Sequence, residues 1–199
     1  MSMPREKKEI QKEDIMPLDV YIKNRKELRK NIVNFKKDRR IALGPYATFY
    51  FESYETMLAQ VQEMLYIEKG GDEQLKDELI AYNPLIPNGK ELTATLMFEI
   101  DNPVSRAAFL SKVGGIEEKI FMKIGDEMIK AIPEKDVDRT SAEGKASSVQ
   151  FIHFNLTDEQ IQKFKSDNAD VEIGINHNEY SHSTKLSSNN KKSLSADFI

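Results

Sequence analysis

Three histidines, His153, His177 and His182, are the side chains of this 199-residue sequence best suited to hold a transition metal. The sequence contains no cysteine, which excludes thiolate zinc sites, cysteine-ligated iron–sulfur clusters, disulfides and cysteine nucleophiles. His177 and His182 are separated by four residues, the spacing of the histidine half of a zinc finger, but the cysteine pair of such a finger is absent. Any bound metal would therefore have nitrogen and oxygen ligands.

Two predicted strands, 148–156 and 169–175, would bring the histidines together if they paired in parallel around the helix between them. Both strands would then end at the same edge of a sheet, with His153 near His177 and with His182 folded back toward them. Glu63 or Glu179 would complete a two-His-one-carboxylate or three-His site for one iron, zinc or manganese ion. The alternative, which stays open, is that His153 is an ordinary strand residue with a satisfied hydrogen bond and that the other two lie on a loop.

The helical carboxylates do not predict a di-iron centre. Such bundles place Glu-x-x-His pairs on facing helices, and none of the predicted helices contains such a pair, because all three histidines lie outside them. A second candidate site is the polar loop before strand 148–156, where Arg139 and Lys145 could bind an anion through charge-assisted hydrogen bonds. A loop that satisfies its own backbone is the alternative. No phosphate-binding glycine motif and no nucleophile elbow is present.

Charge is unevenly distributed along the chain. Residues 1–40 carry 13 Lys or Arg against 7 Asp or Glu, a balance of +6, and the rest of the chain carries −10 of the total of −4. The basic segment either docks on the acidic body or meets an acidic partner. The acidic body argues against nucleic-acid binding. No apolar run is long enough for a membrane span, and the charged N-terminus lacks a signal peptide, so we expect a cytoplasmic protein.

The pattern of apolar residues predicts interleaved helices and strands without regular βαβ repetition. We therefore expect an α+β fold, with a mixed or antiparallel sheet, helices packed on it and a long N-terminal basic helix. Residues 1–15 are predicted to be a flexible charged arm and 16–199 a single α+β domain. The predicted helices cover 18–40, 53–68, 72–80, 103–113 and 157–165, with a short helix in the tail, and the predicted strands cover 46–51, 92–100, 118–124, 128–132, 148–156 and 169–175.

Several phrases occur together in the order found in one bacterial family. They are Gly44-Pro-Tyr-Ala-Thr-Phe-Tyr-Phe-Glu52, Gln62-Glu-Met-Leu65, Tyr82-Asn-Pro-Leu-Ile-Pro87, Gly114-Gly-Ile-Glu117, Arg139-Thr-Ser-Ala-Glu-Gly-Lys145 and His177-Asn-Glu-Tyr-Ser-His182. Along nearly its whole length after the arm, the chain resembles the family known as domain of unknown function 3501 (DUF3501). The resemblance implies no activity and no catalytic residue. It implies a redox or peroxide-stress setting by association only, because genes of family members often look like neighbours of genes for rubrerythrin-like proteins and iron–sulfur oxidoreductases.

Two functions follow from these observations. The first is a non-enzymatic accessory protein that binds a protein partner, such as a rubrerythrin-like or iron–sulfur protein; the lack of a catalytic motif favours it. The second is a metal-dependent enzyme or metal-binding protein that uses the three histidines. The sequence leaves open whether the protein is an enzyme.

Overall fold

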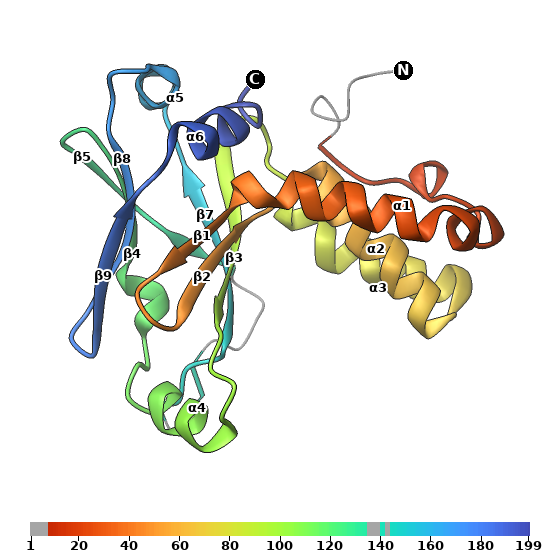
Figure 1. Ribbon diagram of the computed structural model, residues 1–199, viewed down its shortest axis with the longest axis horizontal. Coiled ribbons are helices and arrows are strands. Elements are labelled where there is room, and N and C mark those ends of the chain that lie inside the picture. Colours follow the sequence, from red (N-terminus) through yellow and green to blue (C-terminus); the bar gives the residue numbers. More distant parts are fainter. Residues whose placement is uncertain (1–7, 135–139, 142–143) are drawn as a thin grey trace.

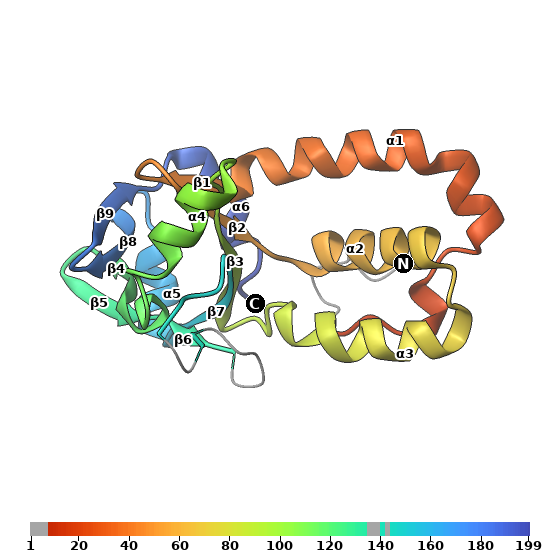
Figure 2. The same ribbon diagram turned by 90° about the horizontal axis from the view of Figure 1, so that it is seen from below.

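The computed structural model describes residues 8–134, 140–141 and 144–199, and within these ranges it has an α+β fold. Two antiparallel sheets form a β body, and three helices form an arm that projects from one side of it (Figures 1 and 2). Among the described residues, no helix is both long enough and apolar enough to cross a membrane.

The larger sheet has five strands in the order β1-β2-β3-β7-β6, and every neighbouring pair is antiparallel. Its central strand β3 is buried along almost its whole length, whereas β7 alternates between buried and half-buried residues. This alternation is expected where one face of a strand lies on the core. The strands are β1 (Arg40–Leu43), β2 (Ala47–Phe51), β3 (Glu91–Phe98), β6 (Ile132–Pro133) and β7 (Val149–Asn155).

The smaller sheet has four strands in the order β5-β4-β8-β9, again all antiparallel. The strands are β4 (Ile120–Ile124), β5 (Glu127–Lys130), β8 (Val171–His177) and β9 (Tyr180–Lys185). Buried side chains of both sheets, among them Phe49, Leu96, Met122 and Ile173, belong to one continuous core. The two sheets therefore pack on each other through their apolar faces.

Short helices close the β body at its two ends. Helix α4 (Pro103–Leu110) lies at one end, and α5 (Asp158–Lys165) and α6 (Ser188–Ser195) lie together at the other (Figure 1). Thr157 and Ser187 each accept a hydrogen bond from the backbone three residues later, so both helices begin with a capping box. The rings of Phe164 and Phe198 meet edge to face at 5.3 Å and join this end to the core.

The arm consists of α1 (Leu18–Lys36), α2 (Tyr54–Glu68) and α3 (Gly71–Tyr82). It has a second core of its own, which includes Met57 and Val61 of α2 and Leu75 of α3. Ile10, inside the predicted flexible arm, is buried in the same core. The flexibility of residues 1–15 stays a prediction, since burial at one position does not measure motion.

Helix α1 ends at Lys36 and continues as one short 3-10 turn, Lys37–Arg39, before β1. The buried guanidinium of Arg39 donates to the carbonyl oxygens of Phe51 (3.0 Å) and Glu52 (2.7 Å) and pairs with Asp197 near the C-terminus. Since breaking a buried ion pair leaves a charge without a partner, this contact holds the end of α1 firmly to the β body.

Two predictions about the strands are wrong. Strands β7 and β8 do not pair in parallel, because β7 lies between β3 and β6 in the larger sheet and β8 lies between β4 and β9 in the smaller one. The segment after β8, predicted as a loop, is strand β9, which pairs with β8 from Glu172↔Lys185 to His177↔Tyr180. The predicted hairpin of 118–124 and 128–132 is confirmed as β4 and β5.

Candidate functional site

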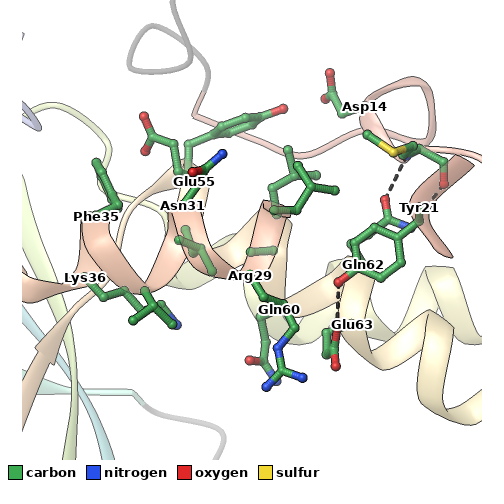
Figure 3. Close-up of a pocket in the computed structure, with 17 residues that line it drawn as sticks. Asp14, Tyr21, Arg29, Asn31, Phe35, Lys36, Glu55, Gln60, Gln62 and Glu63 are labelled. Atoms are coloured by element: carbon green, nitrogen blue, oxygen red, sulfur yellow. Dashed lines mark hydrogen bonds between the residues drawn. The ribbon is translucent and has the colours of Figure 1, made fainter. Parts of the chain in front are cut away.

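An open groove of about 660 Å³ lies between α1 and α2, and we call it the α1–α2 groove. Figure 3 shows side chains of the two helices around it, with Tyr21 toward one end and Phe35 and Lys36 toward the other. The lining is largely apolar: Met16, Tyr21, Leu28, Ile32, Val33 and Phe35 on one side and Tyr54, Leu58 and Ala59 on the other. Its volume is in the range of ligand-binding pockets.

One end of the groove is closed by contacts between α1 and Glu63 of α2. The Glu63 carboxylate accepts a hydrogen bond from the Tyr21 hydroxyl (2.6 Å) and a second from Nε of Arg25 (3.1 Å), and the Arg25 guanidinium forms an ion pair with it. The hydrogen bond from Arg25 lowers the pKa of Glu63. Burial and the Glu63 carboxylate raise the pKa of Tyr21 to about 12, so its hydroxyl remains a donor.

The middle of α1 lies over the groove without entering either core. Leu28, Ile32 and Phe35 repeat at helical spacing and are only half-buried, and Tyr21 is the one fully buried residue of α1. None of these three belongs to a core cluster among the described residues. Val33, beside them, is 60% exposed. Helix α1 is thus held at both ends and leaves an apolar stripe open along its middle.

The other wall is one face of α2. The lining positions Glu55, Leu58, Ala59 and Gln62 follow the helical period, so they lie on one side of α2, whereas Met57 and Val61 face the second core. Leu58 is half-buried, since it lines the groove and also packs against the second core. Gln62 holds the chain before α1 by bonding to both the N–H (2.8 Å) and the carbonyl (3.1 Å) of Met16 (Figure 3).

The α1 side of the groove is positively charged. Arg29 and Lys36 line the groove, and Lys23, Lys26 and Lys30 are exposed on the rest of the helix. Within the part of the chain that the structure describes, these five side chains form no ion pair. The predicted intramolecular docking of the basic segment 1–40 therefore accounts for Lys12, Arg25, Arg39 and Arg40, which pair with acidic residues of the rest of the chain, and not for these five.

His153 is placed on β7, where it lies between two carboxylates. Its Nδ1 is 3.1 Å from Glu91 of β3, and its Nε2 is 2.9 Å from Glu134, directly after β6. The hydrogen bond with Glu91, followed by that with Glu134, raises the pKa of His153 against the opposing effect of burial. Because the two carboxylates contact opposite edges of the ring, His153 links β7 to β3 and to the residue after β6. This is the arrangement of the alternative prediction, in which His153 is a strand residue with satisfied hydrogen bonds.

The structure does not bring the predicted metal ligands together. His177 and His182 lie on β8 and β9 in the smaller sheet, His153 lies in the larger sheet, and Glu63 lies in the arm. The Glu179 side chain is exposed at the β8–β9 turn. The backbone N–H of Glu179 donates a hydrogen bond to Nδ1 of His177 (3.2 Å). Across the described ranges, no group of three or more His, Asp or Glu side chains is arranged to hold a metal ion.

The predicted anion site falls partly outside the described residues, since Arg139 is among those that the structure does not describe. Lys145 is exposed, and its N–H and carbonyl both bond back to Ser141. Thr140 packs this loop on residues 114–117, where its hydroxyl accepts from the Gly115 N–H (3.1 Å) and donates to Glu117 (2.9 Å). The described contacts are those of a loop that satisfies its own backbone.

Tyr180 is a buried residue that the sequence did not single out. Its hydroxyl accepts from the N–H groups of Tyr46 (3.2 Å) and Ala47 (3.0 Å) and donates to the Leu43 carbonyl, which ties β9 to the β1–β2 turn. Gly44 in that turn has φ +60°, and a Cβ there would lie 2.6 Å from the ring of His182. The segments 44–52 and 177–182, two of those that resemble the family, thus meet at a packing contact, which gives both a structural role.

Comparison with known proteins shows a family and a structurally similar protein. A family model described as protein of unknown function (DUF3501) matches residues 9–198. The crystal structure of a protein of unknown function from Burkholderia pseudomallei K96243 is similar, with a TM-score of 0.88 and 33% sequence identity over 96% of this chain and 99% of that chain. A search of curated proteins found no match.

Proposed function

Since the chain belongs to DUF3501, a family of proteins of unknown function, we propose a role from its own geometry: it is a non-enzymatic accessory protein that binds a protein partner in the α1–α2 groove. The observation that carries this proposal is the half-buried stripe of Leu28, Ile32 and Phe35 on a helix fixed at both ends. Apolar residues that belong to no core favour a surface that a second molecule covers.

The form of the groove supports a macromolecule over a small substrate. It is open along α1, with Val33 60% exposed at its edge, and basic side chains that form no ion pair with any described residue lie beside the apolar stripe. An apolar centre with a charged rim is the usual anatomy of a protein–protein interface. Among the described residues, the lining of the groove includes no recognised nucleophile and no histidine, so these residues support binding better than catalysis.

Co-purification from the native organism at low salt tests this role. We expect a discrete protein to be recovered with the wild-type chain and lost with Leu58→Glu or Val33→Glu, which place a charge in the groove. Ile80→Glu is the matched control, because Ile80 is 74% exposed on α3 and does not line the groove. Equal recovery with all three variants would reject the groove. The resemblance suggests a rubrerythrin-like or iron–sulfur protein, and the identity of the recovered protein tests that suggestion.

A further inference from the structure

We propose that the segment bound in the α1–α2 groove is an amphipathic helix of the partner that carries acidic side chains along the edge facing α1. This inference rests on the proposed function and specifies the chemistry of the partner. Three observations support it: the spacing of the apolar positions on both walls, the positive charge of the α1 wall, and the contacts of Glu63 with Arg25 and Tyr21.

The walls of the groove have the spacing of helix-to-helix packing. Leu28, Ile32 and Phe35 on α1 and Leu58 with Gln62 on α2 are three or four residues apart, so each wall presents one ridge along its helix. A third helix can place its own apolar stripe between two such ridges, as in peptide recognition by helix-in-groove binding. With 19 residues rising 1.5 Å each, α1 is about 28 Å long, and a partner helix of about five turns would cover it.

The charges at the groove decide which helix fits. Arg29 and Lys36 line the α1 wall without an ion-pair partner among the described residues, so acidic side chains of an occupant could pair with them. Glu63 is already held by Arg25 and Tyr21 and does not repel such a helix strongly. Glu55 on the α2 wall and Asp14, which precedes α1 and also lines the groove, favour neutral or basic residues on the opposite edge of the occupant.

Two synthetic probe helices test the inference on the full-length protein. Both are 18-residue peptides with the same leucine stripe; the acidic probe has Glu along one edge and the basic probe has Lys at the same positions. We expect fluorescence anisotropy to show at least tenfold tighter binding of the acidic probe at low salt, and this preference should fall sharply at 0.5 M salt because the charges lie at an open rim.

A charge reversal in the groove gives the decisive comparison. Arg29→Glu with Lys36→Glu should remove or invert the preference for the acidic probe. Lys23→Glu with Lys26→Glu changes the charge of α1 equally but at positions that do not line the groove, and it should retain most of the preference. Thermal unfolding of each variant checks that it folds. If Leu58→Glu does not fold, Val33→Glu replaces it as the variant that places a charge in the groove, since Val33 is already exposed.

The outcomes separate this inference from the proposed function. If both probes bind equally and Val33→Glu abolishes both, the groove is a docking site but its partner is not selected by acidic residues. If the acidic probe does not bind while a native partner still requires Val33 and Leu58, the acidic helix is again wrong and the groove remains. If the acidic probe binds with full affinity to Val33→Glu and Leu58→Glu, both the groove and the inference are rejected.

Discussion

His153 contributes to stability as a link between strands. Its ring joins Glu91 of β3 and Glu134 after β6, and hydrogen bonds to the charged form raise its pKa. A group whose folded-state pKa exceeds its unfolded value of about 6.5 stabilises the fold fully below that value and loses this contribution as the pH rises through the folded-state pKa. The short strand β6 is therefore held more firmly at mildly acidic pH, where His153 is protonated, than at alkaline pH.

This argument predicts a pH-dependent loss of stability in His153→Gln. At pH 6 the variant should lose about 1.5–3 kcal/mol of unfolding free energy, the usual range for hydrogen bonds to charged groups. At pH 9 the difference from the wild type should be smaller, because the contribution of the charged imidazole is lost as the pH rises through its folded-state pKa. Urea unfolding at the two pH values measures it. A deficit of the same size at pH 6 and pH 9 would show that the charge of His153 contributes nothing.

At the scale of elements, α1 differs from α2 in how it is held. Only Tyr21 of α1 is fully buried, whereas Tyr54, Thr56, Met57, Val61 and Gln62 of α2 are buried. Local opening needs little free energy where few apolar contacts are broken. We expect amides 24–34 of α1 to exchange at least tenfold faster than amides 57–64 of α2 in hydrogen-exchange mass spectrometry, and to slow when a partner fills the groove. Equal protection in the two helices would contradict the open groove.

The local elements could be predicted from the sequence better than their pairing. Helix α2 begins at Tyr54, directly after its N-cap Ser53 and within one residue of the prediction, because a Ser N-cap and a periodic apolar stripe are signals within the segment itself. Strand β9 was missed because only Tyr180 in it is buried and the other residues are polar. The pairing of β7 and β8 failed for a different reason: contacts between sheets depend on the path of the whole chain, which no local pattern contains.

The candidate site was predicted only in part. The apolar stripe of α1 was visible from its spacing, and the sequence indicated a helix with one face to be covered. It could not indicate that this face lies over an open groove, because the groove depends on long-range contacts: Glu63 of α2 binds one end of α1, Arg39 fixes the other end to the β body, and the middle of α1 stays open. The histidines attracted attention by their chemistry, but the fold distributes them over two sheets.

At the scale of the whole molecule, the two hydrophobic cores stabilise two different parts of the structure. The core between the sheets forms a β body, the helical arm with its own core projects from that body (Figure 2), and the α1–α2 groove lies in the arm. Arg39 links the two parts by joining the end of α1 to Asp197 and to the backbone after β2. In this arrangement the β body serves as a base, and the arm offers the surface that a partner can reach.

Site-specific photo-crosslinking in the native organism tests this account most directly. A benzophenone amino acid replaces Val33 at the edge of the groove or, as the control, Ile80 on the outer face of α3; both positions are largely exposed, so neither replacement disturbs a core. The account predicts a discrete protein adduct from position 33 and none from position 80. No adduct from position 33, or the same adduct with equal yield from both positions, would contradict the claim that the α1–α2 groove is where this protein binds its partner.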